Sequence, residues 1–191
     1  MQKAVPNAFT LIELLVVISI MAIVAILAVA NYRSFGEGQI LPNTALDLNS
    51  TLRTAQTNAT TALQCSGSPL YYWRVEIYKS SGKINVSLDC FYGNIVSYAV
   101  DIIKTEVWPQ NITVERIYDN GGCDNDLAGD LPNYYVYFKF QPLSGYVTME
   151  SKAAAFLQNC TGSKATIQLK NTTNGELKHV NIEQKGGIYV N

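Results

Sequence analysis

The sequence has almost none of the residue patterns that carry catalysis. It contains a single histidine, His179, which lies on an expected strand between Lys178 and Val180. It has no G-x-S-x-G turn, no H-E-x-x-H pair and no phosphate-binding glycine loop. We therefore expect a protein that is not an enzyme and that needs no cofactor.

Charge is scarce as well. Only 15% of the residues are charged and the formal net charge is −1, so no global charge attracts nucleic acid or acidic lipid. None of the cysteines stands in a C-x-x-C pair, which argues against zinc and thioredoxin-like chemistry. No lysine, arginine or histidine lies between Phe9 and Tyr32. The chain is organised around this stretch without cations.

The stretch from Phe9 to Ala30 is apolar almost throughout and carries one charge, Glu13. As a helix it would be about 33 Å long, enough to cross the ~30 Å hydrocarbon core of a bilayer. A secretory signal peptide would be shorter, would lack the carboxylate and would end in a small-residue cleavage site, whereas here the small residue Ala8 precedes the run. A carboxylate in lipid costs about 2.5–3.5 kcal/mol, so we expect a cationic partner for Glu13 from outside its own helix.

These residues resemble the class III signal of type IV pilins and type II secretion pseudopilins. A short polar leader with one lysine is followed by Ala8 and then by FTLIELLVVISI. The resemblance implies cleavage between Ala8 and Phe9 by a cytoplasmic prepilin peptidase and methylation of the new Phe9 amine. It also implies that Glu13 neutralises the amino terminus of a neighbouring subunit during assembly. The family usually has glycine before the cut, so Ala8 predicts slower processing. An ordinary membrane anchor is the alternative interpretation.

The sequence predicts one membrane span and one globular head. Lys3 is the only charge of the leader and favours a cytoplasmic amino terminus, which places the head outside the cytoplasm. Two glycines and Pro42 weaken any continuous helix after the span, although a kinked, unbroken helix is the alternative. The predicted segments are a leader (1–8), a transmembrane and filament-core helix (9–35), a hinge (36–43) and the head (44–191).

The head should have an α+β fold with one helix packed on antiparallel sheet. A helix over 44–63 is predicted because small and apolar residues recur at steps of three and four, at Ala45, Leu48, Leu52, Ala55, Ala59 and Ala62. We expect this stripe to pack in the core, with partner binding as the alternative. Period-two alternation predicts strands over 71–78, 84–90, 112–118, 134–140, 145–149, 166–169, 180–182 and 188–190. The stretch 95–108 fits strand or helix, and 151–158 is predicted as a short helix.

Two head segments resemble strands of H-type pseudopilins and related minor pilins. They are YFKFQPLSGYVT, residues 137–148, and the closing stretch 166–190, whereas 92–132 matches nothing recognisable. The resemblance implies a pilin-like structural subunit of a type IV pilus or a type II secretion pseudopilus. Its implied partners are other pilin or pseudopilin subunits, prepilin peptidase, an inner-membrane assembly platform and, before assembly, membrane lipid. The implied location is a single-pass membrane protein that later enters a pilus or a periplasmic pseudopilus.

Two other functions compete with this interpretation. A minor pilin that captures DNA would carry several basic residues on the closing hairpin, but Lys185 is the only one near 186–191. Nucleic acid is therefore not an expected partner. A membrane-anchored binding domain that never polymerises is the other alternative.

The four cysteines suit an exported head, in which an even number predicts two disulfides. Three pairings are possible. We favour Cys65–Cys90, because these residues flank one predicted hairpin, and this leaves Cys123–Cys160. Four free buried thiols are the alternative.

The acidic loop 119–130 is the one candidate metal site. Asp124, Asp126 and Asp130 have the relative positions one, three and seven of a calcium loop. Ala128 occupies the intervening ligand position, however, and no glutamate closes the loop. We therefore expect a solvated turn, with calcium as the alternative.

Overall fold

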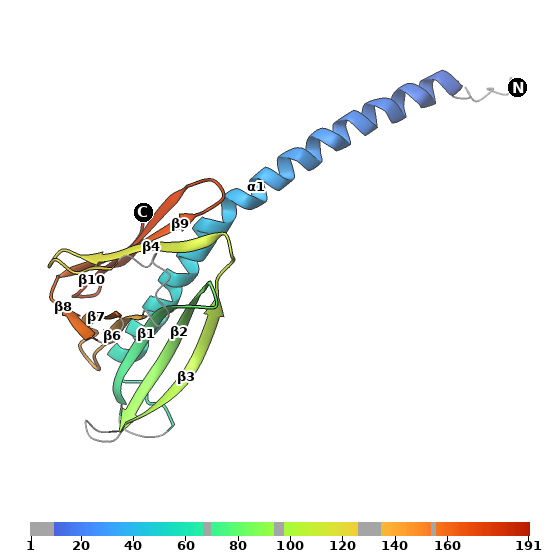
Figure 1. Ribbon diagram of the computed structural model, residues 1–191. Coiled ribbons are helices and arrows are strands. Elements are labelled where there is room, and N and C mark those ends of the chain that lie inside the picture. Colours follow the sequence, from blue (N-terminus) through green and yellow to red (C-terminus); the bar gives the residue numbers. More distant parts are fainter. Residues whose placement is uncertain (1–9, 67–69, 94–97, 126–134, 154–155) are drawn as a thin grey trace, which may run out of the picture. The chain divides into compact units, whose positions relative to one another are not determined.

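A computed structural model describes residues 10–66, 70–93, 98–125, 135–153 and 156–191. One helix, α1 (Leu11–Thr60), is followed by β-strands. The strands are β1 (Leu70–Ser80), β2 (Lys83–Gly93), β3 (Tyr98–Val107), β4 (Ile112–Asp119), β5 (Asp124–Asn125), β6 (Tyr135–Phe140), β7 (Val147–Ala153), β8 (Phe156–Cys160), β9 (Lys164–Asn171), β10 (Leu177–Glu183) and β11 (Ile188–Val190). The expected α+β class with an N-terminal helix and a β-rich head is thereby confirmed (Figure 1).

The strands form two antiparallel sheets. A six-stranded sheet has the order β3-β2-β1-β6-β7-β8, and a five-stranded sheet has the order β11-β10-β9-β4-β5. All pairs are antiparallel, and the predicted hairpin 71–90 is confirmed as β1 and β2. The ambiguous stretch 95–108 supplies β3.

The helix predicted over 151–158 is wrong. Ser151 belongs to β7, and the chain returns as β8 with Met149 opposite Cys160. Local composition favoured a helix, because the stretch contains several alanines. The stretch forms a strand instead because β7 pairs with β6, and strand preference depends on the neighbours that a segment meets.

The helix has no break at 36–43, which agrees with the alternative of an unbroken helix, while the hinge at these residues stays a prediction. Helix α1 continues through Gly36, Gly38 and Pro42, so the helix predicted over 44–63 is the last part of α1 rather than a separate element. The boundary between the two compact units of the chain, Met1–Ile40 and Leu41–Asn191, falls inside the expected hinge. Helix propagation costs less than nucleation, so an established helix can continue through unfavourable residues.

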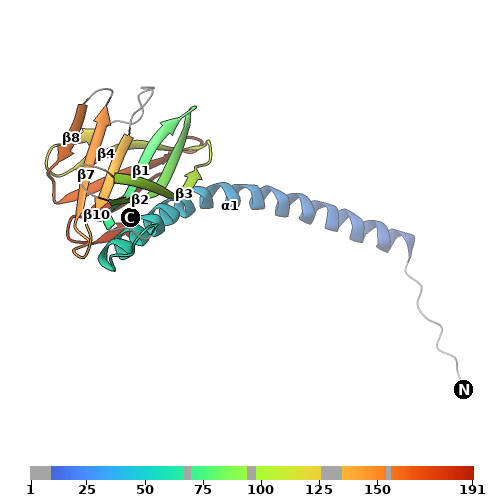
Figure 2. The same ribbon diagram turned by 90° about the horizontal axis from the view of Figure 1, so that it is seen from below.

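The core of the unit Leu41–Asn191 is built on one stripe of α1. Its members recur at steps of four and three and are fully buried: Leu41, Ala45, Leu48, Leu52, Ala55 and Ala59. Ala62 lies beyond the helix with a positive φ of 49° and does not extend the stripe. In Figures 1 and 2 the teal end of α1 lies alongside both sheets. Core packing of this stripe is therefore confirmed, and the partner-binding alternative is wrong.

Polar contacts hold the end of α1 against the closing hairpin. The guanidinium of Arg53 donates to the carbonyl of Ile188 at 2.5 Å, and the amide of Gln56 donates to the carbonyl of Gly186 at 3.2 Å. Gly186 has a φ of +112°, and a Cβ there would lie 2.6 Å from Nε2 of Gln56. The positive φ of this turn favours glycine, whereas the amide of Gln56 is the movable end of its side chain and could shift away from a Cβ.

An ion cluster stabilises the outer face of the six-stranded sheet. Nε and Nη2 of Arg74 donate to Oδ2 of Asp89 at 3.0 and 2.7 Å, and Nη2 also lies 2.8 Å from Glu76. The Asp89 side chain is only 2% exposed. The guanidinium carbon lies 4.4 Å from the ring centroid of Phe91 and 4.8 Å from that of Tyr137. Burial raises the pKa of the Glu76 carboxyl above its ordinary value, while the charge of Arg74 opposes this rise.

Candidate functional site

The candidate site begins at the start of α1. The leader and the predicted cleavage residues Ala8 and Phe9 lie outside the described residues, so the cleavage and methylation sites remain predictions. Glu13 lies in the first turn of the helix. The part of the site that the structure describes therefore begins at Thr10.

Thr10 and Glu13 form a reciprocal cap. The backbone N–H and the hydroxyl of Thr10 donate to Oε2 of Glu13 at 2.9 and 2.8 Å. The backbone N–H of Glu13 donates in return to Oγ1 of Thr10 at 3.3 Å. This is a capping box, which satisfies N–H groups that a helix start leaves unpaired. The pattern T-x-x-E before an apolar run signals this cap, which the sequence-based expectation of a cationic partner for Glu13 did not include.

The capping box forms the start of α1, and the apolar side chains that follow it are exposed on all sides of the helix. The large apolar side chains from Leu11 to Leu27 are 48–82% exposed. Exposed apolar surface of this extent normally marks contact with lipid or protein.

Among the described residues, no helix combines the length and the apolar character needed to cross a membrane.

The cysteines lie in the head in the pairing that we favoured from the sequence. Cys65 is bonded to Cys90, which joins the chain after α1 to β2. Cys123 is bonded to Cys160, which joins the segment after β4 to the end of β8.

We expect no free thiol in the native protein. Alkylation of the unreduced, denatured chain should label none of the four cysteines, and non-reducing peptide mapping should recover the two bridges. Each bridge should add about 2–4 kcal/mol to the free energy of unfolding. Full labelling of all four positions before reduction would instead favour four free thiols.

Asp119 organises the loop around the second disulfide. Its Oδ1 accepts the N–H groups of Gly121 and Cys123 at 3.0 and 2.7 Å, and its Oδ2 accepts the N–H of Gly162 at 2.7 Å. Asp119, Cys123 and Cys160 form a compact group of potential metal ligands. The two sulfurs are bonded to each other, however, and the carboxylate already accepts three donors, so this group is a structural clasp.

The calcium hypothesis stays untested. Asp124 pairs with Tyr118 through the short strand β5, while Asp126 and Asp130 lie outside the described residues. His179 lies on β10, where its backbone exchanges hydrogen bonds with Asn191 at 3.1 and 2.9 Å. Nothing in this geometry assigns His179 a chemical role.

Comparison with known families concerns the start of the chain and the first part of α1. The family model described as the prokaryotic N-terminal methylation motif matches residues 6–29. This motif is typical of type IV pilin and pseudopilin precursors, and it points to a type IV pilin-like protein that is processed by prepilin peptidase. No curated protein and no solved structure matches the chain.

Proposed function

We propose that this chain is a structural subunit, a minor pilin or pseudopilin, of a type IV pilus or a type II secretion pseudopilus. The observation that carries the proposal is the N-terminal methylation motif over residues 6–29, which includes the exposed apolar first part of α1. The head strands 137–148 and 166–190 give the proposal a finer form, because they resemble H-type pseudopilins and related minor pilins. The protein acts through assembly and not as an enzyme.

In this mechanism the apolar helix is stored in the membrane and then transferred into a filament. Before assembly its exposed side chains contact lipid, and afterwards they contact the helices of other subunits, so apolar surface stays away from water in both states. The Phe9 amine of a neighbouring subunit supplies the positive charge for Glu13. The inner-membrane platform drives the transfer, and the head remains outside the cytoplasm.

Processing is expected to remove residues 1–8. Intact-mass measurement of protein extracted from membranes of cells with active prepilin peptidase should show a chain that begins at methylated Phe9. Ala8→Gly should be cut faster, because the family usually carries glycine there. A chain that retains Met1 in those cells would contradict the proposal.

Recovery in filaments tests the function itself. In cells that carry the matching assembly system, shearing should release a detectable share of the wild-type subunit together with other pilin or pseudopilin subunits. A cell that lacks the assembly platform is the control, and there the processed subunit should stay in the membrane fraction. Equal fractionation with and without the platform would favour an anchored domain that never polymerises.

A further inference from the structure

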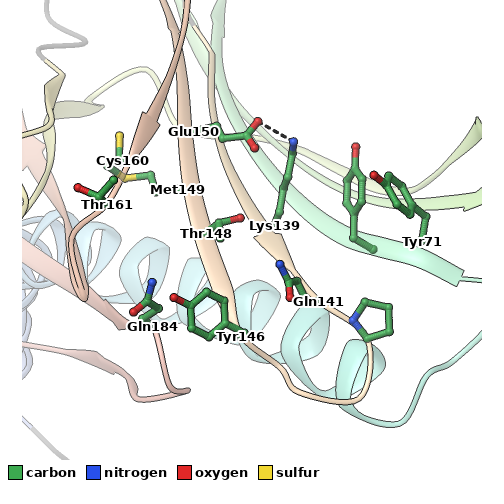
Figure 3. A pocket seen from close by; sticks show the side chains of 12 residues that line it. Tyr71, Lys139, Gln141, Tyr146, Thr148, Met149, Glu150, Cys160, Thr161 and Gln184 are labelled. Atoms are coloured by element: carbon green, nitrogen blue, oxygen red, sulfur yellow. Dashed lines mark ion pairs between the residues drawn. The ribbon is translucent and has the colours of Figure 1, made fainter. Parts of the chain in front are cut away.

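A groove on the outer face of the six-stranded sheet has the size and lining of a ligand site. Its volume is about 720 Å³, within the range of roughly 300–1,000 Å³ that small-molecule sites occupy. Figure 3 shows Tyr146 and Gln184 toward one end, Tyr71 toward the other, and Lys139, Gln141 and Thr148 between them. All of its lining residues belong to the head, and none of them lies in α1.

A β-bulge places one of its aromatic rings. Leu70 pairs with Tyr92 and Tyr72 pairs with Phe91, so Tyr71 is an extra residue without a partner in the register. In a regular strand Tyr71 and Tyr72 would point to opposite faces, but their ring centroids lie only 4.9 Å apart. A bulge is a known means of redirecting a side chain. Tyr71 remains 38% exposed and Tyr146 remains 36% exposed, so both rings are accessible.

Gln141 and Gln184 are anchored by their backbones, and their side-chain amides are not used by the protein. The backbone N–H of Gln141 donates to Tyr146 at 2.9 Å, and the backbone N–H of Gln184 donates to Ser163 at 2.8 Å. Within the described part of the chain, neither the side-chain amide of Gln141 nor that of Gln184 has a hydrogen-bond partner. Each amide offers two donors and one acceptor to a ligand.

The groove carries no net charge. Among its lining residues Lys139 is the one basic side chain and Glu150 the one acidic side chain, and the two form an ion pair at 2.6 Å. Such a lining does not select a phosphate, a carboxylate or a cation, each of which needs uncompensated charge of the opposite sign. It suits a neutral ligand that combines apolar faces with many hydroxyl groups.

The groove is also poorly suited to an extended peptide. Strands β1, β6 and β7 are interior strands of the sheet, each with a neighbour on both sides. Their backbone groups are committed to the ladder, so a peptide could not add to the sheet there. Recognition must come from side chains that stand above the sheet.

We propose that this groove binds a neutral carbohydrate. A pyranose ring has a face of C–H groups that stacks on Tyr71 or Tyr146, and its hydroxyls meet the amides of Gln141 and Gln184. The Lys139–Glu150 pair supplies a further donor and acceptor at the side of the groove. This inference goes beyond the proposed assembly function, since it gives the head a ligand whether or not the subunit polymerises.

The test uses the processed, disulfide-intact full chain in a detergent without a sugar headgroup, because a glucoside or maltoside would compete. The protein is applied to an array of neutral glycans that includes β-1,4-linked glucose and N-acetylglucosamine hexasaccharides, and hits are titrated by calorimetry. Tyr71→Ala and Tyr146→Ala are each expected to weaken binding about tenfold, and Gln141→Leu at least about threefold. Tyr78→Ala is the matched control, because Tyr78 lies on the same strand and face but does not line the groove. It should change the affinity less than about twofold.

The results separate the possibilities clearly. Binding that is lost in the groove variants and kept in Tyr78→Ala supports the proposal. Absence of binding to every neutral glycan at millimolar concentration overturns it. So does binding that survives the combined Tyr71→Ala and Tyr146→Ala changes, or a preference for sulfated glycans, DNA or an unstructured peptide. None of these outcomes depends on filament assembly, so failure here is distinct from failure of the proposed function.

Discussion

Replacing Glu13 with valine or glutamine is expected to leave the processed subunit in the membrane and to lower its recovery in filaments at least about tenfold. The physical reason is the charge balance of the assembled helices. If Glu13 neutralises the Phe9 amine of a neighbouring subunit, either change leaves that amine unpaired in an apolar environment. An uncompensated charge there costs about 2.5–3.5 kcal/mol on insertion scales, and a tenfold change in an equilibrium requires only about 1.4 kcal/mol.

The capping box allows the charge of Glu13 to be separated from its role in the helix. Glutamine can still accept hydrogen bonds from Thr10 at this position, whereas valine cannot. Thr10→Val is the matched control, because it removes the hydroxyl from the cap and keeps the carboxylate. A charge requirement predicts that both Glu13 variants fail and that Thr10→Val assembles. A capping requirement predicts instead that Glu13→Gln assembles and that the two valine variants fail.

The measurement is the ratio of sheared to membrane-bound subunit at matched expression, with processing checked by intact mass. The head should be unaffected, so the two disulfides serve as the folding control. Wild-type recovery of both Glu13 variants would show that this carboxylate is not an assembly group. The anchored binding domain would then become the better interpretation.

Arg74→Met is expected to destabilise the head by about 3–5 kcal/mol. Removing the guanidinium leaves the carboxylate of Asp89 buried without its counterion, and breaking a buried pair from one side has this large cost. The carboxylate has little other compensation, because within the described residues its Oδ1 is buried and lacks a hydrogen-bond partner. The loss should appear as a lower denaturation midpoint at an unchanged slope in urea.

Two further variants make this result specific. Arg74→Met combined with Asp89→Asn should recover much of the stability, since the most deeply buried carboxylate of the cluster is then neutral and only the more exposed Glu76 has lost its pairing with Arg74. Lys139→Met breaks the more exposed Lys139–Glu150 pair on the same face, and it should cost no more than about 1 kcal/mol. An Arg74→Met protein as stable as the wild type would contradict the assignment of this cluster as a stabilising pair. Equal instability of the single and double variants would contradict it as well.

The sequence predicted the elements whose signals are local. The alternation of Val75 and Ile77 with polar neighbours indicated β1, and the stripe from Ala45 to Ala59 indicated the core-facing side of the helix. The sequence-based predictions were wrong where helix continuation or strand pairing outweighed the local residue preferences. Gly36, Gly38 and Pro42 disfavour a helix but do not end this one, and the alanine-containing stretch after β7 became a strand because of what it pairs with.

By itself the sequence contained the methylation motif, a contiguous string of residues that points to a type IV pilin-like protein. It also contained the capping box, which depends only on residues three apart. Only the tertiary structure decided that Asp89 is buried beside Arg74 and that Asp119 clasps the second disulfide. It alone brought Tyr71, Gln141 and Gln184 to one groove. Such contacts join positions far apart in the chain, and the energy of each depends on burial that exists only after the sheets have formed.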